Sequence, residues 1–378
     1  MTGPGEGRLA SPSAILVGAG FLAGLGLRLF LAWDSYGNYD QTSWGIVGEI
    51  AARGGNVYAE TPRYNYGPIW FLMLSLFHRA AEVTGWPLHF VVRGFLTLVD
   101  AGNAVLVGLL AREAGVRGAR VGSLVYVLSP VAILIIGFHG QFDNLAALPL
   151  LAATLLTLRG GAAPRLATVW ALATLALCLK HLCLFSVWML LVYAAGGVRK
   201  AAVLMAGSLA VFGAQFLPWL EGGADGIVQN VLRYSGIPRP YGVTTLLPRG
   251  VAAVLFVVVL AALPALARGP LRLGLTRAME LAAVALMTFI PGTGEAYFIV
   301  PAIWGAVHAS AGYWVFSAVA YVFILTGPNN LQAIPISPPW NAVWLSLVVW
   351  GILVLRDARR AQAPSPTNAG AREAGSGR

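Results

Sequence analysis

The fold is decided by long apolar runs such as GVAAVLFVVVLAALPALA, residues 250–267, in which no side chain is charged. A helix of roughly 20 such residues crosses the hydrocarbon core of a bilayer. Across all 378 residues, 58% are hydrophobic and 11% are charged, and this leaves too little polar surface to solvate a water-soluble globule of that length. The composition therefore predicts an all-α protein with the bilayer as its solvent.

Similar runs recur along the chain and predict a polytopic membrane bundle of about twelve spans with both termini in the cytoplasm. The predicted spans are residues 14–33, 89–111, 121–138, 143–158, 166–180, 182–198, 201–219, 250–267, 278–291, 296–309, 311–327 and 340–355. Residues 1–13 form a cytoplasmic N-terminal segment in this interpretation, and residues 14–356 form the membrane domain. The tail, residues 357–378, is rich in Ala, Gly, Ser and Pro, which predicts disorder in the cytoplasm.

The basic residues lie mainly on one set of alternating loops between the runs. Sixteen of the 25 Lys and Arg residues fall on that set, while nine of the 15 acidic residues, counting Asp143 at its edge, fall on the other set. Lys and Arg stay on the cytoplasmic side of a membrane, so the acidic loops are predicted to face outward. Topology then explains the net charge of +10, and nucleic acid is not expected as a partner.

The first outer loop, residues 34–88, is long and contains a short apolar run at residues 67–81. A full crossing there would put Arg112, Arg117 and Arg120 outside and invert every later loop. We therefore predict that this run is an interfacial helix on the outer face.

Two carboxylates near the start of this loop are candidates for a general base. Asp34 and Asp40 lie in WDSYGNYDQ, residues 33–41, directly after a predicted span. A base that acts on a substrate at the membrane surface is expected in such a place. The alternative is that both are solvated loop acids that help to orient the chain. Later in the loop, Tyr66 could bind a sugar face or anchor the chain at the interface.

Other polar groups gather at the predicted outer ends of later spans. HGQFDN, residues 139–144, brings His139, Gln141 and Asp143 together in a tight turn, which favours a substrate-binding role. Lys180 and His181 lie at the junction of two spans, where an ammonium could hold a phosphate or simply reach toward the interface.

The second long outer loop, residues 220–249, supplies Arg233 and Arg239, which suit an anionic ligand such as a lipid phosphate. Glu295 lies at a later outer turn, where it could bind substrate or cap the next helix. Arg93 and Asp100 are seven residues apart and share one helix face. We predict that this last pair forms a structural salt bridge inside the bundle.

Taken in order, these motifs resemble those of the GT-C superfamily of membrane glycosyltransferases, especially the dolichyl-phosphate-glucose glucosyltransferase branch, which builds lipid-linked oligosaccharides. GNYD at residues 37–40, followed by Trp44, is similar to the Gly-Asp-Tyr-Glu…Trp motif of that branch. The other similarities are Tyr66-Gly67-Pro68 to Tyr-Pro-Pro, Arg93…Asp100 to Arg…Ala-Asp, His139-Gly140-Gln141-Phe142 to His-Gly-His-Phe-Gln, and residues 179–181 and 295–297 to its Lys-containing and His-Glu-Lys segments.

The resemblance implies an enzyme that moves a hexose or pentose, with inversion, from a polyprenyl-phosphate sugar to a lipid-linked or cell-envelope glycan acceptor on the extracytoplasmic face. Where the family has Asp and then Glu, this chain has Asn38 and then Asp40, so the base is either Asp40 or Asp34. No cofactor is expected, and a divalent metal stays an open alternative. The rival class is a flippase or transporter of lipid-linked sugars or small solutes, although no internal repeat of the kind common in transporters is evident.

Overall fold

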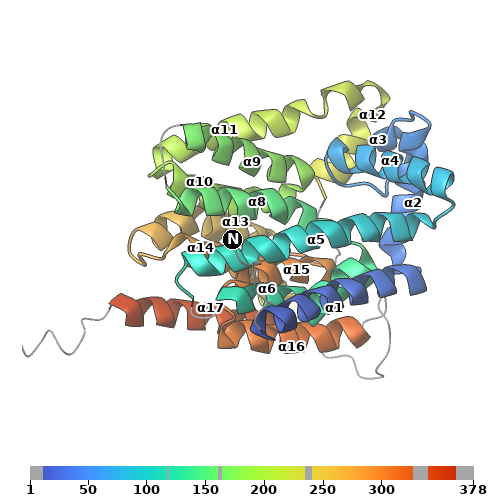
Figure 1. The fold of residues 1–378 in the computed structure, drawn as a ribbon. Helices are drawn as coiled ribbons and strands as arrows, with labels where there is room; N and C mark the ends of the chain where they lie inside the picture. Colours follow the sequence, from blue (N-terminus) through green and yellow to red (C-terminus); the bar gives the residue numbers. More distant parts are fainter. Residues whose placement is uncertain (1–11, 117–118, 161–163, 235–240, 327–338, 363–378) are drawn as a thin grey trace, which may run out of the picture.

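The computed structural model describes residues 12–116, 119–160, 164–234, 241–326 and 339–362, and every regular element within these ranges is a helix (Figure 1). The elements are α1 (Pro12–Asp34), α2 (Tyr39–Ala52), α3 (Val57–Glu60), α4 (Pro68–Thr84), α5 (Leu88–Glu113), α6 (Ala119–Val127), α7 (Pro130–Leu134), η1 (Ile135–His139), α8 (Asp143–Leu158), α9 (Pro164–Leu179), η2 (His181–Cys183), α10 (Leu184–Ala194), α11 (Val198–Ala214), η3 (Leu217–Trp219), α12 (Leu220–Gly226), η4 (Ile227–Leu232), η5 (Gly242–Thr245), α13 (Arg249–Arg268), α14 (Leu275–Phe289), η6 (Glu295–Phe298), α15 (Ile299–Ala306), α16 (Ala311–Thr326) and α17 (Trp340–Gln362). The all-α prediction is therefore confirmed for the described part of the chain.

Each of the predicted apolar runs contains helix in the structure. Five helical stretches are long and apolar enough to cross a membrane, judged by length and composition. They are Ile15–Asp34, Leu88–Glu113, Val198–Leu232, Arg249–Arg268 and Asn341–Arg360. Several apolar helices could thus span a membrane, while the number of about twelve crossings stays a prediction.

Three predicted runs differ from the helices observed. The run 121–138 is broken before Pro130, because proline lacks the N–H that would continue α6, and Ser129 caps the new helix α7. The run 201–219 does not end at residue 219, since η3, α12 and η4 follow it as far as Leu232, with a kink at Glu221 and Gly222. Helix α17 extends to Gln362, so the first residues of the predicted disordered tail are helical. Residues 363–378 lie outside the described ranges.

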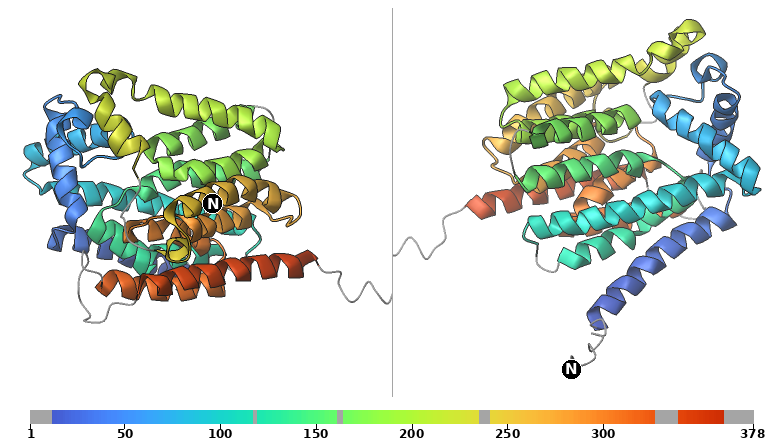
Figure 2. Two further views of the ribbon diagram at one scale, coloured as in Figure 1. Left: turned by 180° about the vertical axis from the view of Figure 1, so that it is seen from behind. Right: turned by 45° about the horizontal axis from the view of Figure 1, so that its top comes forward.

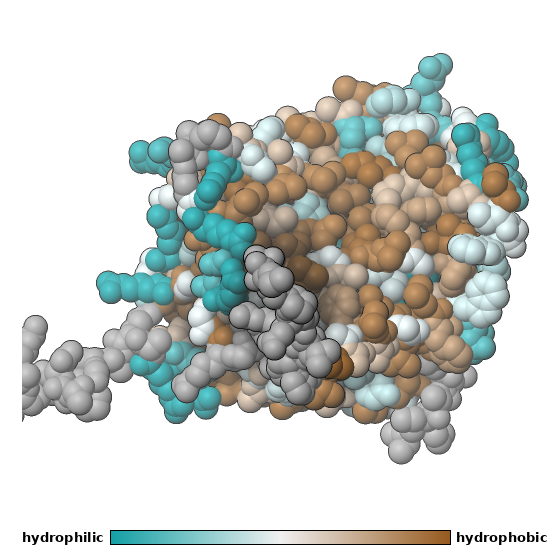
Figure 3. Space-filling view, in the orientation of Figure 1, coloured by the Kyte–Doolittle hydropathy of each residue, from teal (hydrophilic) through white to brown (hydrophobic). Residues whose placement is uncertain are grey.

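The long helices lie side by side, and the helices of the first loop gather at one end of the bundle. In Figure 1, α2, α3 and α4 lie at the right-hand end, next to α12, and the turned views of Figure 2 show the same arrangement. The run at residues 67–81 forms the helix α4, and its position at the membrane interface stays a prediction. In Figure 3, apolar side chains cover the middle of the visible face and polar ones cluster at its left and right ends, a banding that suits a protein whose middle lies in hydrocarbon.

The core of the bundle contains α14 and α8. Nearly every residue of α14 from Leu275 to Thr288 is buried, as are most residues of α8. By contrast, only 17% of the most apolar window of α1 is buried within the protein. Helix α1 therefore presents most of its apolar surface outward.

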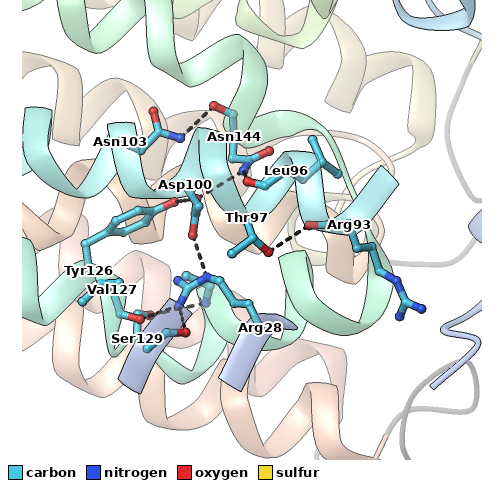
Figure 4. Close-up of polar contacts among 12 residues, drawn as sticks. Arg28, Arg93, Leu96, Thr97, Asp100, Asn103, Tyr126, Val127, Ser129 and Asn144 are labelled. Atoms are coloured by element: carbon cyan, nitrogen blue, oxygen red, sulfur yellow. Dashed lines mark hydrogen bonds and ion pairs between the residues drawn. The ribbon is translucent and has the colours of Figure 1, made fainter. Parts of the chain in front are cut away.

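A buried ion pair joins α1 to α5, and it is not the predicted one. Arg28 Nε lies 2.8 Å from a carboxylate oxygen of Asp100, and both side chains are completely buried (Figure 4). Asp100 also accepts hydrogen bonds from the Tyr126 hydroxyl and from the Asn144 amide. The predicted salt bridge between Arg93 and Asp100 is wrong, because the Arg93 guanidinium points away toward backbone carbonyls (Figure 4).

Candidate functional site

The start of the first loop is bound tightly to the turn that follows η1. Four successive carbonyls, from Gly137 at the end of η1 to Gly140 just after it, accept hydrogen bonds from side chains. Arg93 Nη1 donates to Gly137 O and Phe138 O, each at 3.0 Å. Gln41 Nε2 donates to His139 O at 2.7 Å, and Trp44 Nε1 donates to Gly140 O at 3.2 Å. A π-helical end leaves carbonyls without helical partners, and here α5 and α2 supply the missing donors.

Two glycines allow this close approach. Gly37 has φ +93° and Gly140 has φ +67°, values that residues with a Cβ rarely adopt. A Cβ on Gly37 would lie 2.5 Å from Phe138 O, and one on Gly140 would lie 2.2 Å from the Gln41 amide nitrogen. The two motifs that the sequence singled out, at residues 37–44 and 139–144, therefore meet in space.

Asp40 lies where these two motifs meet. Its carboxylate accepts a hydrogen bond from Gln141 Nε2 at 2.5 Å. Burial raises the pKa of the Asp40 carboxyl above its ordinary value, and this effect outweighs the opposing influences of the Gln141 hydrogen bond and the Lys180 charge. A carboxyl group with a raised pKa in a cavity is better suited to accept a proton than a fully solvated one.

Lys180 is buried and surrounded by one carboxylate and three aromatic rings. Its ammonium is paired with Asp143, and the Lys180 side chain is 1% exposed. The same ammonium lies 4.5 Å from the ring centroid of Phe142, 4.9 Å from that of Tyr66 and 5.2 Å from that of Tyr297. Three ring faces and one carboxylate stabilise a charge that would otherwise be costly to bury.

Two cavities meet beside these residues. The polar cavity has a volume of about 160 Å³, and its lining includes Asn38, Asp40, His139, Gln141 and Glu295. The apolar groove has a volume of about 330 Å³, and its lining includes Lys180, His181, Leu184, Phe185, Phe256 and Val257. Tyr66, Tyr234 and Tyr297 line both of them.

The apolar groove runs between α10 and α13 and reaches the outer surface of the bundle. The rings of Phe185 and Phe256 pack edge to face across it, with centroids 5.1 Å apart. Val257, which also lines the groove, is 53% exposed. An apolar chain could therefore enter from the side of the bundle and reach the three tyrosines.

The structure brings most of the predicted site residues together. Asp40, Tyr66, His139, Gln141 and Glu295 line the polar cavity, while Lys180 and His181 line the groove. Asp143 pairs with Lys180. The Nδ1 atom of His181 is buried and has no hydrogen-bond partner within the described ranges.

Two predicted site residues are not brought into this cluster. Asp34 is exposed at the end of α1 and lines neither cavity. Arg233 is exposed and also lines neither, although its neighbour Tyr234 lines both. Arg239 lies outside the described residues.

Three further residues belong to the site, and the sequence did not single them out as site residues. Asn38 forms hydrogen bonds with His139 and with the backbone N–H of Asp40. The sequence feature that could have indicated its role is an Asn directly before a helix, where it acts as an N-cap. Tyr234 and Tyr297 each lie within two residues of a predicted site residue. Their aromatic character alone did not distinguish them from interface anchors.

No group of three or more His, Cys, Asp or Glu side chains within the described ranges is placed to hold a metal ion. Comparison with protein-family models finds no match to this chain, and comparison with curated proteins finds none either. The functional conclusion therefore depends on the geometry of the two cavities and on the sequence motifs.

Proposed function

We propose that this chain is a GT-C type membrane glycosyltransferase that moves a hexose or pentose, with inversion, from a polyprenyl-phosphate sugar to an acceptor on the extracytoplasmic face. The observation that carries the proposal is a pair of adjoining cavities that share three lining tyrosines. One is apolar and reaches the surface, the other is polar and contains the Asp40 carboxylate, and the Lys180 ammonium lies beside the tyrosines that both share. A polyprenyl-phosphate sugar has the same order of parts: an apolar tail, an anion and a polyhydroxylated ring.

In this proposal the isoprenoid tail occupies the groove between α10 and α13, and the phosphate lies near Lys180 and His181. Lys180 has three N–H donors and Asp143 engages the ammonium from one side, so a phosphate oxygen can share the charge. The sugar passes the three tyrosines into the polar cavity. There, His139, Gln141 and Glu295 offer groups that can form hydrogen bonds to its hydroxyls.

The proposed reaction is a single displacement. The Asp40 carboxylate takes the proton of the acceptor hydroxyl, the hydroxyl oxygen forms a bond to the anomeric carbon, and the bond from that carbon to the phosphate oxygen breaks. The electron pair leaves on the polyprenyl phosphate. Lys180 offsets the charge that grows on the leaving group, and such preorganised electrostatic stabilisation supplies several kcal/mol in comparable sites.

The membrane orientation is part of the same proposal. The basic loops face the cytoplasm, both termini lie on that side, and α2, α3 and α4 form the outer cap of the bundle. The chain would then be a multi-pass protein of the cell membrane with its site at the outer end. The ordered resemblance of residues 37 to about 300 to GT-C motifs supports this interpretation.

The experiment is to incubate the purified protein in lipid nanodiscs with polyprenyl-phosphate sugars of several hexoses and pentoses and a crude glycolipid acceptor fraction. We expect release of polyprenyl phosphate together with a new glycosidic bond of inverted anomeric configuration. Retention of configuration, or no cleavage of any donor, would contradict the proposal. Prior chelation of divalent ions should leave the rate unchanged, because Lys180 is the proposed counter-charge for the phosphate.

The second candidate is a transporter of lipid-linked sugars or small solutes, for which buried charged residues such as Arg28, Asp100 and Lys180 would line a path. In the structure, Arg28 and Asp100 are paired with each other and completely buried. Proteoliposomes that move a labelled lipid-linked sugar across the bilayer without cleaving it would favour this candidate.

A further inference from the structure

The side-chain amide of Asn38 is bonded at both of its ends. Its Oδ1 accepts a hydrogen bond from the backbone N–H of Asp40 at 3.1 Å, which makes Asn38 the N-cap of α2. Its Nδ2 lies 3.0 Å from Nδ1 of His139, a residue that is 1% exposed. One amide therefore connects the start of α2 to the histidine of the opposite turn.

The cap fixes which way the amide points. A backbone N–H can only donate, so the atom that faces Asp40 N must be the amide oxygen. The NH2 group then faces His139, and it too can only donate. The Nδ1 atom of His139 must accept this hydrogen bond, and it cannot carry a proton itself.

We infer that Asn38 is a positioning residue that holds His139 in the neutral tautomer with its proton on Nε2. An imidazolium would place an N–H against the amide N–H2, so protonation of His139 would require the cap to break. The other titratable groups that line the same cavity are Asp40, Glu295 and the tyrosines Tyr39, Tyr66, Tyr234 and Tyr297, and the Arg93 guanidinium binds the two preceding carbonyls.

The consequence for catalysis rests on the proposed function. His139 then carries its proton on Nε2 and is not a second base, and Asp40 is the group that accepts the proton. The tautomer itself does not depend on that function. An aspartate at position 38 would reverse the assignment, because a carboxylate can still cap α2 but presents only acceptors to His139 and favours a proton on Nδ1.

The test is nitrogen NMR of the full-length protein with ¹⁵N-labelled histidine. The chain has five histidines, so the His139 signals are assigned by their loss in His139→Gln. We expect the unprotonated nitrogen of wild-type His139 to be Nδ1, and we expect Asn38→Asp to move the proton to Nδ1 or to protonate both nitrogens. A wild-type His139 with its proton on Nδ1 would overturn the inference without the need for any variant.

Asn56→Asp is the matched control. Asn56 also caps a helix, accepting the Tyr58 N–H at 3.2 Å, but its amide donates to the backbone oxygens of Trp219 and Glu221 instead of to a histidine. We expect this variant to leave the His139 spectrum unchanged. If Asn56→Asp changed the tautomer as Asn38→Asp does, or if Asn38→Asp left it unchanged, the inference would be wrong. Failure of sugar transfer with the expected tautomer would count against the proposed function alone.

Discussion

The Asp40 carboxylate and the Gln141 amide, 101 residues apart in the chain, are joined by a hydrogen bond of 2.5 Å. This contact connects the first loop to the turn before α8, and both residues line the polar cavity. An amide that donates to a carboxylate stabilises the ionised form. Gln141 therefore helps the partly buried Asp40 carboxylate to stay ionised and able to accept a proton. The hydrogen bond thus offsets part of the rise in the pKa of Asp40 that burial causes.

Sugar transfer should therefore decline on the acid side as Asp40 takes up a proton. Because burial raises the pKa of Asp40, half of kcat/KM should be lost at a pH above about 3.9, the ordinary value for an aspartate. In Gln141→Leu the stabilising hydrogen bond is absent, and we expect the acid limb to move to higher pH. A pH–rate profile of both proteins checks this, and an unchanged limb in Gln141→Leu would count against Asp40 as the base.

The ionised Asp40 carboxylate should also lower the stability of the folded state at neutral pH. A carboxyl whose pKa is raised in the folded state contributes stability only where it is protonated, below its unfolded pKa, and that contribution is lost as the pH rises through the folded pKa. We therefore expect Asp40→Asn to have a Tm at pH 7 that is equal to or higher than that of the wild type. A clear drop in Tm would mean that the ionised carboxylate is a structural group.

Breaking the buried Arg28–Asp100 pair by removing one partner should strongly destabilise the bundle. Removing one partner of a buried ion pair leaves an uncompensated charge and lowers the free energy of unfolding by about 3–5 kcal/mol. Arg28→Met should therefore unfold at a much lower denaturant concentration. In the double variant Arg28→Met/Asp100→Leu, the loss should be clearly smaller than the sum of the single losses. For Arg93→Gln and Asp100→Leu, the losses in the free energy of unfolding should instead add within about 0.5 kcal/mol. Strong coupling between these two variants would support the predicted salt bridge between Arg93 and Asp100.

Gly37 should tolerate no side chain. In Gly37→Ala, the left-handed backbone and the contact with Phe138 O act together, so we expect a loss of more than about 2 kcal/mol in the free energy of unfolding. Gly54 has φ +80° but open space around it, and Gly54→Ala should cost only the backbone strain of about 1–2 kcal/mol. Gly45 lies within α2 with nothing nearby, and Gly45→Ala should be neutral or stabilising. Equal losses at Gly37 and Gly54 would show that the contact contributes nothing.

The sequence predicted the helices well because apolar runs depend on local composition. The run 250–267 corresponds to α13 almost residue for residue, and the short run 67–81 corresponds to α4. Helix ends that depend on packing were harder to predict. The 201–219 run gave no sign that helical structure would continue to Leu232, where α12 packs against α3 so closely that a Cβ on Gly226 would lie 1.9 Å from Tyr58 O.

The partners of the charged residues could not be predicted from spacing. Arg93 and Asp100 share a helix face, but Arg28 comes from a different helix, and no local pattern shows which cation reaches Asp100. The motif residues of the candidate site were predictable because polar groups are rare at these positions. Spacing alone could not distinguish Asp34 from Asp40, and in the structure Asp40 is the one of the two that lines the polar cavity.

The most direct measurement is the single-turnover rate of sugar transfer by two variants, Asp40→Asn and Asp34→Asn, in the same nanodiscs. Each replaces a first-loop carboxylate by an amide of nearly the same shape. Removal of a general base costs typically 10²–10⁴-fold, so we expect that loss for Asp40→Asn and a rate within about twofold of wild type for Asp34→Asn. A near-normal rate in Asp40→Asn, or the larger loss in Asp34→Asn, would contradict the assignment of Asp40 as the base.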